Sequence, residues 1–111
     1  MPIYSRYDVV SVPFPYTDRT ALERRPALVV SEPNLESRFG LLWVLMITSA
    51  ENRSWDSDVA IPDHRGAGLP IPSIVRPTKI ATVDASRARK RGRISASTAG
   101  LVADAIKSII F

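Results

Sequence analysis

The stretch ERRPALVV, Glu23 to Val30, places two arginines and a proline directly against a continuous apolar run. Proline pushes the residue before it towards an extended backbone, so Arg25 is expected at the mouth of a strand with its side chain held in a set direction. The aliphatic and β-branched residues that follow predict a strand over Pro26–Ser31. A similar run predicts a second strand over Leu41–Thr48. Because neither run alternates with polar residues, we expect both faces of the sheet to be covered.

Shorter segments predict the rest of a sheet. DVVSVP, Asp8 to Pro13, is β-branched and should end at the Pro-Phe-Pro of residues 13–15, because proline removes a donor from the ladder. The segment EPNLESRFG, between the two apolar runs, contains proline, asparagine and glycine and is interpreted as a turn. Brief strands are also predicted near Val59–Ile61, Ser73–Val75 and Ile80–Val83.

The last segment has the period of a helix, because Leu101, Val102, Ala105, Ile106 and Ile109 recur at the spacing of one helical face. Ser95 or Ser97 can cap its N-terminus. Many short strands with turns between them and one terminal helix predict a mainly β fold, a small and strongly bent antiparallel barrel with a C-terminal helix.

The length and the amino-acid composition are those of an ordinary globular protein. With 111 residues the chain can bury one core but not two, so a single domain over residues 1–111 is expected. The absence of cysteine excludes a disulfide framework and a thiolate zinc site. We find no apolar run long enough for a bilayer and no apolar signal segment near the N-terminus, and therefore expect a soluble, cytoplasmic protein without membrane contact.

Positive charge is concentrated in the second half of the chain. The net charge is +4; residues 1–60 hold 6 basic and 8 acidic side chains, whereas residues 61–111 hold 9 basic and 3 acidic ones. This asymmetry favours a polyanionic partner such as a nucleic acid, although a solvated positive face has the same composition. The run RARKRGR, Arg87 to Arg93, either follows a phosphate backbone or forms the solvent face of a hairpin arm.

Individual residues suggest a phosphate site. The guanidinium of Arg25 is a rigid fork of donors that matches a phosphate, the alternative being a surface ion pair with Glu23 or Asp18. Arg76, in IVRP, repeats the arrangement of apolar pair, arginine and proline. Thr48, which ends its apolar run together with Ser49, supplies a hydroxyl, or is simply a strand residue.

Other side chains carry weaker indications. The ring of Tyr16, in a predicted loop, could stack on an unpaired base, whereas Trp43 is predicted to lie in the core. His64 is the only histidine, and a solvated loop residue is the simpler interpretation. No cluster of histidines and carboxylates is evident in the sequence, so neither a metal nor another cofactor is expected.

In order along the chain, DVVSVPFPYTD, RRPALVVS, VLMITS and AGLPIPSIVRPTKIATVD, with the terminal helix, resemble the MazF/PemK toxins from about Tyr7 to the C-terminus. The resemblance implies an SH3-like barrel of the CcdB/PemK type and a homodimer. It also implies a sequence-specific, metal-independent endoribonuclease, or mRNA interferase, of a type II toxin–antitoxin system. Such an enzyme cleaves single-stranded mRNA by attack of the substrate's 2′-OH, and a cognate antitoxin inserts a disordered tail into the RNA groove.

Roles carry over residue by residue. Arg25 matches the family's catalytic arginine before proline, Thr48 its strand-end threonine, and Arg76 an arginine that PemK-type members use in a VVR segment. RNA contacts are further predicted for Tyr16, Arg24, Ser49, Thr78 and Lys79.

The chain also departs from the family. Tyr7 replaces a common glycine, the first long loop lacks the histidine of one branch, and Thr78 stands where the PemK branch has an aspartate. The general base is therefore unassigned, with Asp18 and Glu23 as candidates. Two other functions remain open: a CcdB-like protein that poisons DNA gyrase, and a non-catalytic barrel that binds nucleic acid through residues 87–93.

Overall fold

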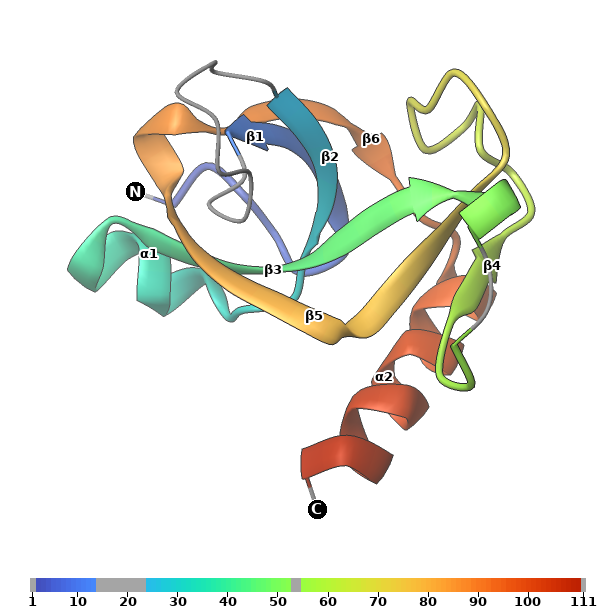
Figure 1. Cartoon of the computed structure of the whole chain (residues 1–111). Helices are drawn as coiled ribbons and strands as arrows, with labels where there is room; N and C mark the ends of the chain where they lie inside the picture. Colours follow the sequence, from blue (N-terminus) through green and yellow to red (C-terminus); the bar gives the residue numbers. More distant parts are fainter. Residues whose placement is uncertain (1, 14–23, 53–54, 111) are drawn as a thin grey trace.

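In the computed structural model, which describes residues 2–13, 24–52 and 55–110, the strands form one antiparallel sheet. The six strands of this described part are β1 (Asp8–Pro13), β2 (Arg24–Val29), β3 (Leu41–Ser49), β4 (Val59–Ile61), β5 (Ser73–Asp84) and β6 (Arg89–Arg93). Their order in the sheet is β4-β5-β3-β2-β1-β6. The sheet curls strongly upon itself into a half-barrel, and the C-terminal helix lies below it (Figure 1). The predicted fold class, a small bent antiparallel barrel with a terminal helix, is confirmed.

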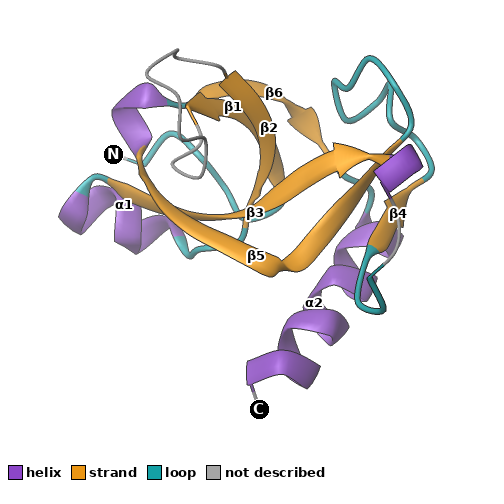
Figure 2. Ribbon diagram, in the orientation of Figure 1, coloured by secondary structure: helices purple, strands orange, loops and turns teal. Residues whose placement is uncertain are grey.

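Two α-helices accompany the sheet, α1 (Pro33–Phe39) between β2 and β3 and α2 (Ala96–Ile110) at the end of the chain (Figure 2). The prediction of α2 is confirmed, and Ser95 is its cap, because its Oγ accepts a hydrogen bond from the backbone N–H of Thr98. No helix within the described ranges is long and apolar enough to span a membrane.

Helix α1 corrects the prediction of a turn over EPNLESRFG. Pro33 occupies the start of the helix, where its missing N–H is not needed. Gly40 ends it in a left-handed conformation with φ of 69°, and its N–H donates to the carbonyl of Glu36 at 2.8 Å. Pro33 and Gly40 therefore mark the two ends of a short helix, although their presence in one segment suggested a turn.

Strand β5 is continuous where two separate pieces were predicted. Arg76 pairs with Met46 of β3 and Ile80 pairs with Leu45, so the three residues 77–79 of β5 have no partner across the ladder. This bulge contains Pro77, which has no N–H to donate, and β5 bends sharply along its length in Figure 1. The interruption that the sequence shows at Arg-Pro-Thr-Lys is thus a bend within one strand.

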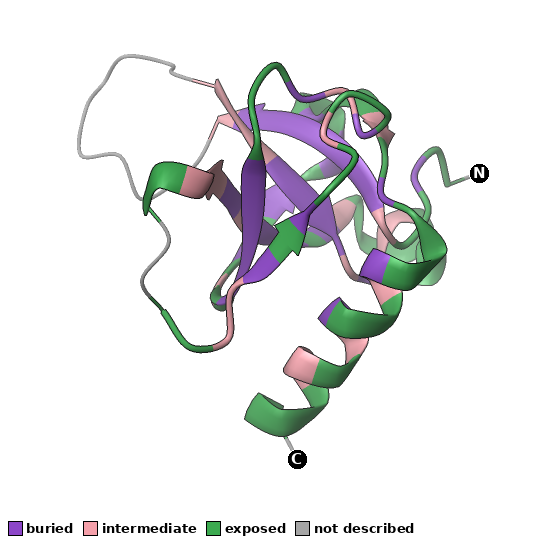
Figure 3. Ribbon diagram, turned by 90° about the vertical axis from the view of Figure 1, so that its right-hand side faces the viewer, coloured by how far each residue is buried: buried purple, intermediate pink, exposed green. Residues whose placement is uncertain are grey.

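The sheet has a hydrophobic cluster on each face, which confirms that both faces are covered. On β3, Leu42 and Val44 belong to one cluster, whereas Leu45 and Ile47 belong to the other, which Val102 of α2 completes. The inner strands are buried, and α2 is buried along one side only (Figure 3).

The prediction that Trp43 lies in the core is wrong, because this residue is 50% exposed. Trp43 lies on the same face of β3 as Leu45, but beyond the end of the cluster that α2 covers. Ile80, the partner of Leu45 across the ladder, is also exposed.

Tyr7, just before β1, has a left-handed backbone with φ of 77°. Its N–H donates to the carbonyl of Val29 at 2.6 Å, and its own carbonyl accepts from the N–H of Ile94 at 3.3 Å. These two hydrogen bonds join the residue before β1 to the end of β2 and to the segment after β6. A residue with a β-carbon adopts this conformation at a cost of about 1 kcal/mol, which explains a preference for glycine.

Candidate active site

Arg25 of β2 and Thr48 of β3 line the same pocket, which has a volume of about 330 Å³. Ala27 pairs with Met46 in the antiparallel ladder, so two residues further out Arg25 and Thr48 lie across from each other. Both residues are partly buried. The other lining residues are Pro26, Ile47, Ser49, Asn52, Leu69, Pro70, Ile71, Ser73 and Arg91. Arg25, near the start of β2, and Thr48, near the end of β3, therefore line one pocket.

A short 3₁₀ turn after β3, Ala50–Asn52, orients the hydroxyls of the pocket. The side-chain amide of Asn52 donates to Thr48 Oγ1 at 3.0 Å, and the backbone N–H of Glu51 donates to Ser49 Oγ at 3.2 Å. Because each hydroxyl oxygen already accepts one of these bonds, its own proton is available for donation to a ligand. The pocket thus presents two hydroxyl donors beside a guanidinium.

Arg91 of β6, an exposed arginine, also lines the pocket. A β-carbon on Gly68, whose φ is 79°, would overlap the carbonyl oxygen of Arg91, and one on Gly92 would lie 2.5 Å from the carbonyl carbon of Ala67. The loop that contains Gly68 therefore lies with its backbone directly against β6. This close approach brings residues 69–71 and Arg91 to the same pocket.

Asn52 and Arg91 were missed as site residues from the sequence. The run RARKRGR indicated a possible phosphate contact but not which of its cations faces the site. In the fold its members have different surroundings: Arg91 lines the pocket, whereas Arg93 binds the buried carboxylate of Asp8 at 2.7 Å. For Asn52 the sequence offers no comparable indication.

Arg24 points to a different part of the molecule from Arg25, as adjacent residues of a strand do. Its Nε donates to Ser11 Oγ at 3.0 Å and its Nη2 to the carbonyl of Arg87 at 2.6 Å. Burial, with a contribution from the positive charge of Arg89, lowers the pKa of Arg24 below its usual value. The pocket beside it is lined by Pro13, Arg24, Ser86, Arg87 and Arg89.

The structure does not place Arg76 among the residues that line the Arg25–Thr48 pocket. Its Nε and Nη2 donate to the two carboxylate oxygens of Asp58 at 3.0 and 2.9 Å. The guanidinium also stacks over the ring of Trp55, 4.3 Å from the centroid. The hydrogen bond with Asp58 raises the pKa of Arg76 above its usual value.

The remaining predicted RNA contacts are dispersed. Thr78 is exposed in the bulge of β5, and Lys79 lies beside it with its Nζ 5.8 Å from the ring centroid of Trp55. Neither lines the pocket. Tyr16 and the two candidate bases, Asp18 and Glu23, lie outside the described residues.

No carboxylate or imidazole occurs among the described residues that line the pocket, and His64 is not one of them. Across the described ranges, no group of three or more histidines, aspartates or glutamates is close enough to hold a metal ion. The chemistry of the described wall is therefore that of guanidinium, hydroxyl and amide groups.

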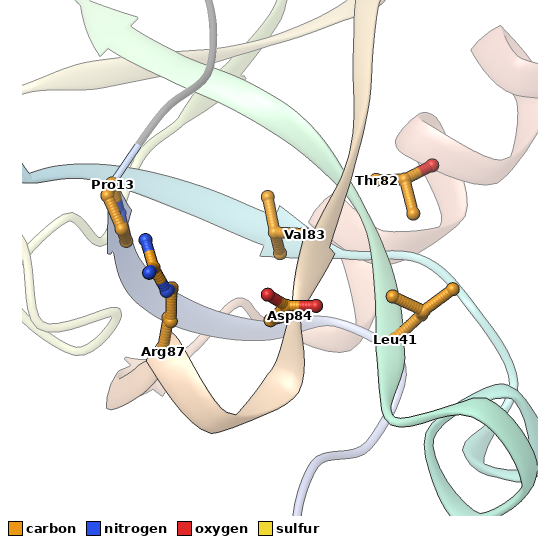
Figure 4. Close-up of a pocket in the computed structure, with 6 residues that line it drawn as sticks. All are labelled: Pro13, Leu41, Thr82, Val83, Asp84 and Arg87. Carbon is orange, nitrogen blue, oxygen red and sulfur yellow. The ribbon is translucent and has the colours of Figure 1, made fainter.

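Figure 4 shows a further pocket, of about 230 Å³, where Leu41 begins β3 and Asp84 ends β5. It is lined by Pro13, Leu41, Thr82, Val83, Asp84 and Arg87. This pocket lies at the opposite end of β3 from Thr48. Because it contains the carboxylate of Asp84 as well as the guanidinium of Arg87, it suits a polyanion less than the pocket of Arg25 does.

Comparison with known proteins agrees with this fold. Residues 5–110 match the family model described as PemK-like, MazF-like toxin of type II toxin–antitoxin system. None of the curated proteins matches the chain. Similar solved structures include MazF from Deinococcus radiodurans, with 22% identity, a TM-score of 0.77 and coverage of 97% of this chain and 96% of that one. A mycobacterial endoribonuclease in complex with its cognate antitoxin gives 17% identity, a TM-score of 0.76 and coverage of 96% and 93%. The Mycobacterium tuberculosis toxin MazF-mt6 gives 20% identity, a TM-score of 0.73 and coverage of 91% of this chain and 93% of that one.

Proposed function

Because the chain belongs to the family of PemK-like, MazF-like toxins of type II toxin–antitoxin systems, we propose that it is an endoribonuclease that cleaves single-stranded RNA. The observation that supports this activity is the pocket in which Arg25 and Arg91 lie with the hydroxyls of Thr48 and Ser49. Two cations and two oriented hydroxyl donors fit a phosphodiester, which carries negative charge on two oxygens.

The proposed reaction is attack of the substrate's 2′-OH on the adjacent phosphorus. The bond from phosphorus to the 5′-oxygen breaks, the leaving 5′-oxygen takes a proton from water or from the protonated base, and the products are a 2′,3′-cyclic phosphate and a free 5′-OH. Negative charge on the phosphate oxygens grows in the transition state, where Arg25, Arg91 and Thr48 would stabilise it. Removal of one such donor typically costs about 100- to 1,000-fold in rate.

Proton transfer is left to groups other than the arginines, because a guanidinium stays protonated. Asp18 and Glu23 remain hypotheses for the base that accepts the proton of the 2′-OH. No step of this scheme requires a metal ion, and we therefore propose metal-independent cleavage.

The pocket also suits an unpaired nucleotide. Leu69, Pro70 and Ile71 form an apolar wall of the pocket that Arg25 and Arg91 also line, and Ile71 is 48% exposed. A base that is not held in a duplex can pack on such a wall while its phosphate reaches Arg25. This arrangement favours single-stranded RNA over a duplex as the substrate.

We further propose a cognate antitoxin and a homodimer. Some of the similar solved structures are complexes of MazF with MazE, and one is an endoribonuclease with its cognate antitoxin. An acidic antitoxin segment that occupied the pocket of Arg25 and Arg91 would compete directly with RNA. Sedimentation of the purified toxin should give twice the mass of one chain, and addition of the antitoxin should block RNA cleavage.

One assay tests the activity. Purified protein is incubated with a long RNA in EDTA, and the new 5′ ends are mapped. We expect cuts that carry a 5′-OH, that disappear in Arg25→Ala and that persist in Arg38→Ala, a control in which an exposed arginine of α1 is removed.

Other outcomes would identify the other candidate functions. Intact RNA together with gyrase-dependent DNA breaks would show a CcdB-like poison. RNA binding without cleavage or DNA breaks, weakening steeply with salt, would show a non-catalytic barrel.

A further inference from the structure

Arg76, Asn52 and Thr48 are joined by consecutive hydrogen bonds. The Nη2 of Arg76 donates to the backbone carbonyl of Asn52 at 2.8 Å, and the side-chain amide of Asn52 donates to Thr48 Oγ1 at 3.0 Å. We propose that Arg76 is a positioning residue, which with Asp58 fixes Asn52 and thereby aims the hydroxyl of Thr48 into the pocket. This inference rests on the proposed function, because it assigns Arg76 a role in the same RNA cleavage.

The surroundings of Arg76 favour this role over direct contact with RNA. The residue is only 7% exposed. Three hydrogen bonds from its guanidinium go to Asp58 and Asn52, and the indole of Trp55 covers one face of the group. The side chain of Asp58 is wholly buried. A buried cation that is already bound in two directions and stacked on an indole is poorly placed to follow a phosphate.

The strand register explains why the clamp, defined as Arg76 with Asp58, reaches the pocket. Arg76 pairs with Met46 and Thr48 pairs with Ile74, so Arg76 and Thr48 lie on the same face of the sheet. The turn of residues 50–52 follows β3 directly, which brings the carbonyl of Asn52 to Arg76 and its amide back to Thr48.

Without the clamp, Asn52 would be held weakly. It is exposed and belongs to a short 3₁₀ turn with no buried residue. A segment of this kind opens easily unless other contacts fix it. If Thr48 loses its partner, its hydroxyl is free to rotate and to donate elsewhere. Misplacement of a catalytic group by about 1 Å costs on the order of 100-fold in rate.

Single-turnover cleavage in four variants tests the proposal. Arg76→Lys keeps the charge but not the forked geometry, Arg76→Gln removes the charge, Asp58→Asn weakens the clamp, and Asn52→Ala removes the final donor. We expect each to lower the maximal single-turnover rate constant by roughly 10- to 100-fold, with the half-saturating protein concentration nearly unchanged because Arg25 and Arg91 remain. Arg65→Gln, at an exposed loop arginine, serves as the control with full activity.

Coupling gives a second readout that a merely structural role would not produce. In a Thr48→Val background, the further change Asn52→Ala or Arg76→Gln should cost little more, because all three act through one hydroxyl. Independent, multiplicative losses would overturn the proposal. So would full activity of Arg76→Lys, or a loss in Arg76→Gln that neither Asp58→Asn nor Asn52→Ala shares, since that pattern indicates contact between Arg76 and RNA.

Two measurements keep the test independent of folding and of the nuclease activity itself. Asn52→Ala changes an exposed side chain and should leave the unfolding midpoint close to that of the original chain. The side-chain amide resonances of Asn52 should move towards free-amide values in Arg76→Lys. Unmoved resonances would overturn the clamp, whereas a chain that cuts no RNA but shows the shift would overturn only the proposed function.

Discussion

The side-chain amide of Asn52 donates a hydrogen bond to Thr48, with 3.0 Å between Nδ2 and Oγ1. This contact decides what the threonine can do. Because the oxygen accepts from Asn52, the hydroxyl proton is directed towards other acceptors, and we expect Thr48 to act as a donor in the pocket that it shares with Arg25. A residue that is common in strands for its shape thus becomes a group suited to an anionic transition state.

Replacement of Thr48 with valine should slow RNA cleavage by about 100- to 1,000-fold, because it removes one preorganised donor and preserves the shape. Thr48→Ser, which keeps the hydroxyl, should retain most of the rate. Single-turnover kinetics on a defined RNA would measure both. Thr82→Val is the matched control, since Thr82 is exposed and lines the pocket at the far end of β3. Equal rates for Thr48→Val and the unaltered chain would contradict this role.

Arg91→Gln should lower the affinity for RNA and should make that affinity less dependent on salt concentration. Each phosphate contact that is lost lowers the slope of log affinity against log salt by about 0.7 for a single strand. Binding of a 2′-O-methylated RNA, which cannot be cleaved, can be titrated at several salt concentrations. Arg38→Gln, on helix α1, should leave the slope unchanged. A slope that responds to both variants alike would indicate diffuse attraction rather than a site.

Gly68→Ala should destabilise the fold and reduce activity together. The new β-carbon would overlap the carbonyl of Arg91, and the backbone would be left-handed with φ of 79°. We expect a loss of about 1–3 kcal/mol in the free energy of unfolding, measured with urea. Gly100→Ala in α2 meets nothing within 4 Å and should instead raise stability by about 1 kcal/mol. A Gly68→Ala variant as stable as the original chain would contradict the close approach of loop and strand.

Tyr4 should make the protein sensitive to alkali. Burial, together with the negative charge of Glu36, raises the pKa of Tyr4 above its usual 10.0, and its hydroxyl donates to the carbonyl of Ala88 at 2.8 Å. A raised pKa means that the fold favours the neutral phenol. The resulting stability is complete below about pH 10 and is lost as pH rises through the pKa of the folded state.

The comparison that checks this is urea unfolding of the original chain and of Tyr4→Phe between pH 7 and 11. The variant should be less stable at pH 7 by about 1 kcal/mol, because the carbonyl of Ala88 loses its donor. Its stability should then fall less steeply above pH 10. Parallel curves over the whole range would show that Tyr4 is not the group concerned.

Several features could be predicted from the sequence because their causes are local. Apolar runs without alternation indicated strands covered on both faces, and the helical period after Ser95 indicated α2. Proline after Arg25 placed that cation at a strand mouth. Two local patterns gave wrong predictions. Proline and glycine suggested a turn, but they mark the start and the end of helix α1. An apolar run suggested a buried Trp43, but this residue is exposed.

The composition of the pocket was decided only by the tertiary structure. Whether Arg91 or Arg93 faces the pocket depends on the bulged pairing of β6 with β1 and on a glycine-lined approach between a loop and a strand. Whether Arg76 meets RNA or holds Asn52 depends on the register of β3 against β5. These contacts join segments that are distant in the sequence. A pattern of neighbouring residues does not predict which distant segments meet or in which register.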